Sequence, residues 1–389
     1  MKAAHDQPPG WREALNRRMD GWMASPGLYR WAIGNPVGRW ITRRRANALF
    51  AVMAGFVHSQ VLLACVRLHV FELVLAAPRT LDELLLLTPR RLSRDALGRL
   101  LDSALSLQLL SLRPGGRYGL GPLGAPLAAH AGIRAMVEHN ALLYEDLRDP
   151  LQLLEDKGKA SMNAYWTYAA ETQAPPPEPA HRPPPALVDA SARYSELMSL
   201  SQRFVIDELL AVYPFGQHRC VLDVGGGQGG WVSELAEHAP HLKLKLFDLP
   251  PVAALAQARI ERRQLADRIT THPGSFTQDA LPLGADLVTL LRVAHDHSDA
   301  VVRVLLKAIW TALPPGGHLL LAEPMAQPDG HPALGDPYFH FYLLAMGEGR
   351  LRTAAELTAL MSEAGFAPIR RIANPMTLHA SVLLGQKRA

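Results

Sequence analysis

The chain of 389 residues is poor in cysteine and contains only Cys65 and Cys220. Two thiols are too few for the disulfide framework of a small secreted domain or for a zinc site built from four cysteines, and they suit a reducing compartment. The first ten residues also lack an apolar run, so the sequence indicates no secretory signal. We therefore expect a cytoplasmic protein.

Uninterrupted hydrophobic runs are also scarce. The most apolar early stretch, residues 53–78, is broken by His58, Gln60, Arg67, His69 and Glu72. A membrane-spanning helix needs about 20 consecutive, predominantly apolar residues, so we expect buried helices here. With 48% hydrophobic residues, the chain is rich enough to bury a large core, and its length predicts a catalytic domain plus a smaller one.

Positive charge is concentrated near the start of the chain. Residues 1–50 hold nine basic against three acidic residues, a surplus of six, whereas the whole chain carries a net charge of +4. The arginines alternate with aromatic residues, namely Trp11, Trp22, Tyr29, Trp31 and Trp40. We expect a basic arm over residues 1–50 that is solvated or contacts a partner subunit; the alternative is a peripheral contact with anionic lipid headgroups.

Residues 51–126 have the pattern of a winged helix. Thr80-Leu-Asp-Glu83 is a capping box, Ser93 is placed to cap a second helix, and Leu109–Leu112 and Tyr118 flank a glycine-rich turn between two strands. A winged helix can place its second helix in the major groove of DNA. That helix, residues 93–106, has balanced charges, so we expect packing or dimerisation and no nucleic-acid binding.

Two further segments complete the domain prediction. Gln173–Pro185 contains seven prolines and indicates a stiff linker that ends a winged-helix, dimerisation and substrate-lid domain over residues 51–190. In the catalytic domain, residues 191–389, strands alternate with helices, which predicts a Rossmann-like α/β fold with a parallel, doubly wound sheet and a terminal antiparallel hairpin. The expected strands are 218–224, 242–249, 269–273, 285–290, 318–322, 369–373 and 378–386, and the expected helices are 230–238, 252–265, 299–313 and 353–365.

A glycine loop is the sharpest local signal. The strand ending at Asp223 runs into Gly225, Gly227 and Gly230, where the lack of Cβ atoms lets the backbone approach a ligand. The spacing fits both the dinucleotide fingerprint and the loop of methyltransferases that use S-adenosylmethionine. Asp248 can accept hydrogen bonds from either cofactor's ribose. Asp223 favours the methyltransferase interpretation, because an acid suits a sulfonium and an amino group better than a pyrophosphate.

Polar residues follow two later strands. His295 comes directly after the strand 285–290, at the edge of the sheet that faces ligands, and is a candidate general base. Glu323 ends the next strand and is placed to fix the tautomer of that histidine; the alternative is a simple salt bridge. His295-x-His297 also has the spacing of a metal pair, but no third ligand has convincing spacing, so we expect no metal.

An aromatic segment, residues 337–346, carries little charge. It contains the candidate substrate-pocket residues Tyr338, Phe341, Tyr342 and Met346. If these side chains line a pocket, the substrate is a large apolar molecule; a buried core helix would have the same composition.

Together, Asp223-Val-Gly-Gly-Gly227, Phe247-Asp248-Leu-Pro, His295-Asp296-x-x-Asp299 and Glu323 resemble the class I O-methyltransferases with an N-terminal winged-helix dimerisation domain. The resemblance implies a homodimer, S-adenosylmethionine as cofactor with S-adenosylhomocysteine as product, and His295 as base, aided by Glu323 and Asp296. It implies a cofactor site formed by Asp223, Gly225, Gly227, Asp248, Leu249, Ser275, Phe276 and Arg292.

Two positions depart from the family. Ser275 stands where an adenine-binding carboxylate is usual, and Leu351 stands where plant enzymes have a second glutamate, with Glu348 the nearest acid.

Within this family, runs such as Arg292-Val-x-His-Asp-His297 and Phe341-Tyr-Leu-Leu-Ala-Met-Gly347 are similar to the carotenoid O-methyltransferases of purple bacteria. This implies methylation of the tertiary hydroxyl of an acyclic carotenoid, in the cytoplasm and peripheral to the photosynthetic membrane. The alternatives are a carbon methyltransferase of bacteriochlorophyll synthesis, a phenolic or polyketide O-methyltransferase, a winged-helix ligand-sensing regulator, and an NAD-dependent oxidoreductase.

Overall fold

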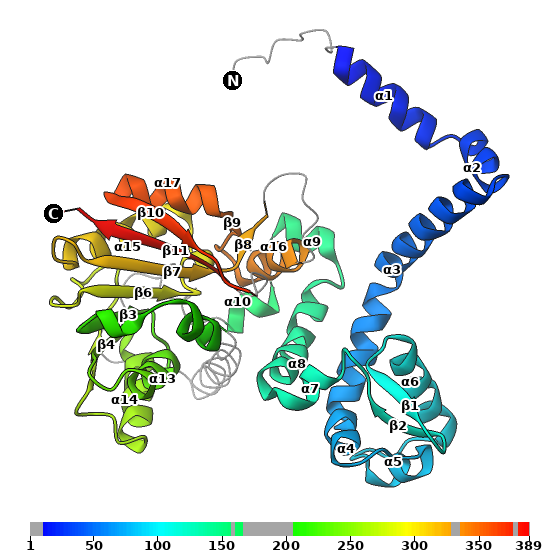
Figure 1. The fold of residues 1–389 in the computed structure, drawn as a ribbon, viewed down its shortest axis with the longest axis horizontal. Helices are drawn as coiled ribbons and strands as arrows, with labels where there is room; N and C mark the ends of the chain where they lie inside the picture. The colour runs from blue at the N-terminus through cyan, green and yellow to red at the C-terminus, as the bar shows by residue number, and fades with distance from the viewer. Residues whose placement is uncertain (1–10, 157–159, 166–204, 328–334, 376–379, 389) are drawn as a thin grey trace. The chain divides into compact units, whose positions relative to one another are not determined.

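The structure of the protein is a computed structural model that describes residues 11–156, 160–165, 205–327, 335–375 and 380–388 (Figure 1). The chain divides into two compact units, Met1–Ala125 and Pro126–Ala389. The predicted proline-rich linker lies outside the described residues. Each unit is described by itself below.

The first unit begins with three consecutive helices and ends with a winged helix. Its elements are α1 (Trp11–Met23), α2 (Pro26–Ile33), α3 (Pro36–Arg67), α4 (Val70–Ala76), α5 (Leu81–Leu87), α6 (Arg94–Ser106), β1 (Leu110–Arg113) and β2 (Arg117–Leu120). Thr80 and Glu83 form the expected capping box of α5, and the Ser93 side chain caps α6. β1 and β2 pair antiparallel around the turn that contains Gly115 and Gly116. The winged-helix prediction is confirmed.

Helix α3 corrects one expectation. The stretch 53–78 was expected to form buried helices, and its later part does so: Leu63, Val66 and Phe71 are at most 5% exposed. Its beginning is instead exposed, with 65% of Met53 and 73% of Phe56 open to solvent. Among the described helices, α3 alone is long and apolar enough to cross a membrane, and only 17% of its most apolar window is buried. The polar residues that interrupt the stretch 53–78 therefore do not indicate that all of it is buried.

The second unit is built on a seven-stranded sheet with the order β10-β11-β7-β6-β3-β4-β5. The strands are β3 (Cys220–Val224), β4 (Lys243–Asp248), β5 (Ile269–Pro273), β6 (Leu287–Leu291), β7 (His318–Glu323), β10 (Phe366–Ile372) and β11 (Ser381–Lys387). The neighbouring strands from β7 to β5 are parallel, and β11 pairs antiparallel with both β10 and β7. The predicted parallel sheet and terminal hairpin are both confirmed.

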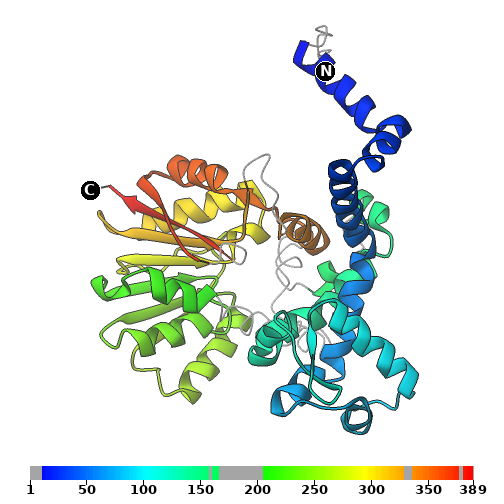
Figure 2. The same cartoon turned by 45° about the vertical axis from the view of Figure 1, so that its right-hand side comes forward.

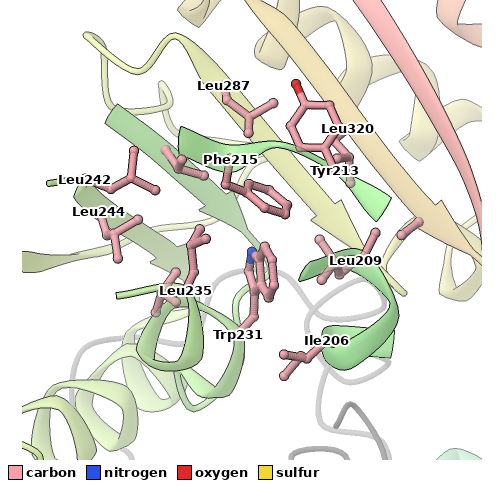
Figure 3. Close-up of a cluster of buried hydrophobic side chains, with 14 of the residues drawn as sticks. Ile206, Leu209, Tyr213, Phe215, Trp231, Leu235, Leu242, Leu244, Leu287 and Leu320 are labelled. Atoms are coloured by element: carbon pink, nitrogen blue, oxygen red, sulfur yellow. The ribbon is translucent and has the colours of Figure 1, made fainter. Parts of the chain in front are cut away.

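Helices cover both faces of this sheet (Figure 2). The helical residues 205–212, α13 (Gly230–His238) and α14 (Pro250–Arg262) contribute to one buried cluster, and α15 (Asp299–Ala312) and α17 (Ala354–Ala364) contribute to the other. Successive residues of β3 join opposite clusters, Val221 the first and Leu222 the second, because side chains alternate across a strand. Figure 3 shows the first cluster, in which the Trp231 ring packs edge-to-face on Phe215, with ring centroids 5.1 Å apart.

A helical layer also belongs to the second unit. α8 (Ala131–Asp146), α9 (Pro150–Glu155) and α10 (Ser161–Tyr165) pack with α16 (Gly335–Met346) in a third apolar cluster that includes Leu143, Met162 and Leu343. The sequence grouped residues 126–165 with the winged helix, whereas their contacts place them with the catalytic sheet. The physical reason is that their apolar side chains are buried against α16.

Candidate active site

The glycine loop between β3 and α13 has the backbone conformation that its sequence predicts. Gly225, Gly227 and Gly229 have φ of 70°, 56° and 74°, a region that other residues rarely adopt. A Cβ at Gly225 would lie 2.6 Å from Val293 Cγ2, whereas a Cβ at Gly227 would meet no atom within 4 Å. Gly225 is therefore required by packing beneath the loop, and Gly227 presents bare backbone to open space, as a ligand cradle does.

Asp248 ends β4 beside this loop and is 3% exposed. Its Oδ2 accepts a hydrogen bond from the Gly227 N–H at 2.7 Å, and its Oδ1 accepts one from the Leu249 N–H, also at 2.7 Å. A carboxylate has about four acceptor positions, so it can accept hydrogen bonds from several donors at once. The structure thus brings together the predicted residues Gly227, Asp248 and Leu249.

Asp223 lies under the loop and is 2% exposed. Its Oδ1 accepts a hydrogen bond from Thr289 Oγ1 at 2.8 Å, and the same hydroxyl oxygen accepts the Trp231 indole N–H at 3.2 Å. A Cβ at Gly226 would lie 2.7 Å from Asp223 Oδ2, so a side chain there would press on the carboxylate. Burial, and then the nearby charge of Asp248, raise the pKa of Asp223 to about 8. Sequence reasoning missed Thr289, although its polar side chain in an otherwise apolar strand was a signal.

The loop after β5 carries Ser275 and Phe276, the predicted contacts for adenine. The Ser275 N–H donates to Asp279 Oδ2 at 2.8 Å, because the chain turns back here and the Asp279 N–H bonds to the Ser275 carbonyl at 2.7 Å. The Phe276 ring packs edge-to-face on His297 at 5.3 Å. The sequence predicted that no carboxylate serves this loop; the structure places the exposed Asp279 beside it, four positions beyond Ser275.

His295 lies in the single-turn helix η3 (Ala294–Asp296) and is 5% exposed. Its Nδ1 hydrogen-bonds Glu323 Oε2. Glu323 is 1% exposed, and its other oxygen accepts the N–H groups of Val293 and Ala294 at 2.9 and 2.7 Å. Because a carboxylate accepts, it holds the proton on Nδ1 and leaves Nε2 as the basic nitrogen. The predicted pairing of His295 with Glu323 is present in the structure.

Asp296 provides a second acid at the same histidine. Its Oδ1 lies 3.1 Å from His295 Nε2. Burial lowers the pKa of His295, but the charges of Asp296 and Glu323 outweigh it, so that pKa is raised above 6.5. Burial raises the pKa of Asp296 to about 6. The sequence predicted that Asp296 aids His295, and the structure places the two side chains next to each other.

A buried arginine braces the histidine turn and was not predicted. Arg352 is 1% exposed, and its guanidinium donates to the carbonyls of Ala294 and His297, both at 2.7 Å, and to Asp299 Oδ1 at 2.8 Å. The backbone at Gly349 also packs closely against the histidine turn. A Cβ at this position would lie only 2.4 Å from the His295 carbonyl oxygen. No local pattern in the sequence marks Arg352, because its partners are more than 50 positions away in the chain.

Arg292 precedes this turn with a φ of 55°, which is uncommon for a residue with a side chain. Its N–H donates to the Ala322 carbonyl at 2.9 Å, which fixes the chain at the end of β6. The charge of Arg292 acts to lower the pKa values of His295, Asp296 and Tyr338. The structure therefore places this predicted cofactor residue in the electrostatic environment of the histidine.

Helix α16 contacts η3 and carries the predicted substrate residues. Tyr338 and Tyr342 stack with ring centroids 5.6 Å apart, and their hydroxyl groups bond Asn140 at 2.9 Å and His139 at 3.1 Å on α8. Burial raises the pKa of Tyr338 to about 12. Tyr342 and Met346 are at most 3% exposed, whereas Tyr338 and Phe341 are partly exposed. The first pair is buried in the helical layer, and the second pair packs against the same cluster while staying partly exposed.

Comparison with known proteins then decides the family. The O-methyltransferase domain family matches residues 187–367, and the O-methyltransferase dimerisation domain family matches residues 50–129. Demethylspheroidene O-methyltransferase of Cereibacter sphaeroides is 39% identical over 336 residues, which cover 86% of this chain and 85% of that protein. The chain belongs to the O-methyltransferase family. The dimerisation match supports a homodimer of this enzyme.

Other similarities agree with the fold. Demethylspheroidene O-methyltransferase of Rhodobacter capsulatus is 37% identical, covering 88% of this chain and 82% of that protein. The solved structure of human N-acetylserotonin methyltransferase in complex with SAM has a TM-score of 0.68 at 24% identity and covers 89% of this chain and 98% of that chain. Among the described residues of this methyltransferase, no group of three His, Cys, Asp or Glu side chains is arranged to hold a metal ion.

Proposed function

We propose that this O-methyltransferase transfers a methyl group from S-adenosylmethionine to the tertiary hydroxyl of an acyclic carotenoid. The observation that carries the proposal is the similarity, at 39% and 37% identity over most of the chain, to two enzymes named for methylation of demethylspheroidene. Acetylserotonin O-methyltransferase of Bos taurus is more distant, at 29% identity over 81% of this chain. The aromatic helix α16 beside His295 suits an apolar substrate.

The residues of the glycine loop fit the cofactor. Bare backbone at Gly227 leaves space for a ligand, and the buried carboxylate of Asp248 is placed to receive the two ribose hydroxyls. Asp223 lies below the same loop, and a bound sulfonium and amino group would favour its carboxylate form, against the effect of burial on its pKa. Asp279 supplies the acid that Ser275 lacks and is a candidate partner for the adenine amino group. When bound, S-adenosylmethionine supplies an electrophilic methyl group.

His295 acts as the general base in this proposal. Glu323 keeps the proton on Nδ1, so Nε2 accepts the hydroxyl proton while the oxygen forms its bond to the methyl carbon and the methyl–sulfur bond breaks. A tertiary aliphatic alcohol is only weakly acidic, so proton removal must accompany methyl transfer. The products are a methyl ether and S-adenosylhomocysteine. Arg352 contributes by fixing the turn that carries His295, because correct positioning of the base and the hydroxyl supplies much of the rate acceleration.

An acyclic carotenoid partitions into membranes, because water disfavours its long apolar surface. We infer that the enzyme is cytoplasmic and meets its substrate at the surface of the photosynthetic membrane.

The test is turnover by the full chain with labelled S-adenosylmethionine in detergent. A 1-hydroxylated acyclic carotenoid, a bacteriochlorophyllide and a simple phenol are offered separately, and mass spectrometry identifies the methylated product. The proposal expects label on the carotenoid hydroxyl, with His295→Ala as the background control. Label only on the tetrapyrrole or the phenol would reject the substrate, and failure to bind the cofactor would favour a ligand-sensing regulator.

A further inference from the structure

The segment before the dimerisation domain has an unusual surface. We define the arm as residues 11–45, which comprise α1, α2 and the first ten residues of α3. Four of the seven tryptophans in the chain lie in it, and 60–73% of each is exposed: Trp11, Trp22, Trp31 and Trp40. Soluble proteins seldom leave several large aromatic side chains uncovered in one segment, so such a surface indicates a contact.

The apolar residues of α1 share one side of the helix. Trp11, Leu15, Met19 and Trp22 follow one another at intervals of four, four and three residues, which brings them into one stripe. Each of them is 48–73% exposed. At the start of α3, Trp40 and Ile41 lie three and four positions after Val37, on the same side of the helix, and the three residues are 41–69% exposed. α1 and the first turns of α3 therefore each carry an apolar side that the described residues do not cover.

Positive charge borders these apolar stripes. The arm contains eight arginines against two acidic residues, Glu13 and Asp20, a surplus of six positive charges. Arg43, Arg44 and Arg45 are exposed, and the Arg44 guanidinium lies 5.7 Å from the centre of the Trp40 ring. Tryptophan and arginine side by side on an amphipathic helix are typical of the interface between lipid headgroups and acyl chains.

We propose that the arm binds the surface of an anionic lipid membrane, with the stripes inserted among the acyl chains and the arginines at the headgroups. The charge of the arm complements anionic lipid, and its tryptophans suit the boundary between water and hydrocarbon. A nucleic acid would match the charge but offers no apolar interior to the stripe of α1. A second copy of the chain is less suited, because the dimerisation domain begins at residue 50, beyond the arm. This inference concerns binding alone and stands whichever substrate is methylated.

The experiment uses the full chain and flotation with two kinds of vesicle, phosphatidylcholine alone and phosphatidylcholine mixed with phosphatidylglycerol. We expect binding to the anionic vesicles, and weaker binding as salt rises. Each arginine removed should weaken binding about fivefold, so the double variant Arg43→Gln/Arg44→Gln should lose about 25-fold. Arg90→Gln/Arg91→Gln is the matched control, because both residues are exposed and the change in charge is equal. It should bind within about twofold of the unaltered protein.

Any of three binding results would overturn the proposal: no binding to anionic vesicles, an equal loss in both double variants, or equally tight binding to DNA with no shift of tryptophan emission on vesicles. Brominated lipids test insertion directly, since they should quench tryptophan emission, and Trp22→Ala/Trp40→Ala should remove part of that quenching.

Alkaline carbonate should release the protein; retention would show that α3 spans the bilayer instead. Light scattering should find the arginine variant dimeric, and a monomer would assign the arm to the partner subunit.

Discussion

Replacing Glu323 by glutamine tests the geometry of the catalytic turn most directly. The side chain keeps its size, and its remaining oxygen can still accept the N–H groups of Val293 and Ala294, which lie 2.9 and 2.7 Å from Oε1. The other terminus becomes an NH₂ donor facing His295 Nδ1. The imidazole must then accept at Nδ1 and carry its proton on Nε2, the nitrogen that the mechanism needs as the base.

The expected loss follows from that change of tautomer. A general base contributes about 10²–10⁴ to a rate, and a base held in the wrong tautomer loses most of that contribution, so kcat should fall by about this factor. Removing one charged hydrogen bond from a carboxylate that is 1% exposed should also cost about 1.5–3 kcal/mol of folding stability. Cofactor affinity should hardly change, because Glu323 contacts the histidine turn and not the glycine loop.

Turnover with labelled S-adenosylmethionine, thermal unfolding and calorimetry of cofactor binding measure these three quantities separately. Glu363→Gln is the matched control, since Glu363 is exposed and pairs only with Arg303 among the contacts described, at 2.9 Å. It should leave kcat unchanged. A Glu323→Gln enzyme that folds, binds the cofactor and turns over within about threefold of the unaltered enzyme would refute the role of His295 as a base held by Glu323.

Four further outcomes are expected. His295→Ala should bind the cofactor normally by calorimetry yet lose most turnover, and unchanged turnover would dismiss the base. Asp248→Ala should weaken cofactor binding in the same assay; unaltered affinity would reject the ribose assignment. Gly225→Ala should lower the melting temperature more than Gly227→Ala. Both substitutions put a side chain at a positive φ, but only the first also places a Cβ 2.6 Å from Val293 Cγ2. Equal decreases in melting temperature would contradict the close packing of Val293 on Gly225. His295 must be neutral to act as a base, so kcat/KM should rise with pH through a pKa above 6.5. Asp296→Asn removes a negative charge beside His295 and should move that rise to lower pH. An unchanged pH profile would show that Asp296 does not raise the pKa of His295.

Much of the fold was predictable because its signals are local. The helix 230–238 and the strand 269–273 appear in the structure with the predicted bounds. Capping boxes, glycine turns and apolar periodicity act within a few residues, so they can be recognised along the chain. The burial of the stretch 53–78 was predicted incorrectly at its start, because whether an apolar residue is covered depends on distant segments.

The candidate site was predictable only in part for a related reason. His295, Glu323 and Asp248 each end or follow a strand, and parallel strands bring such residues to one edge of a sheet. Arg352 and Gly349 act on the histidine turn across more than 50 residues of sequence, and nothing in their neighbourhood indicates those partners. Asp279 is missed for a different reason. The family motif has its carboxylate at the position of Ser275, whereas here a tight turn brings an acid from four positions later back to that place.

The glycine loop and the turn that carries His295 are linked through one residue. Val293 touches both: its side chain lies where any Cβ at Gly225 would intrude, and its N–H donates to Glu323, which in turn holds His295. A displacement of the glycine loop would therefore press on Val293 and disturb the carboxylate that sets the tautomer of the base. Methyl transfer requires the electrophile and the base to be fixed relative to each other, and an error of about 1 Å can cost about 10²-fold in rate. In the proposed mechanism, the close packing of Val293 against Gly225 would thus help to fix the methyl donor relative to the base.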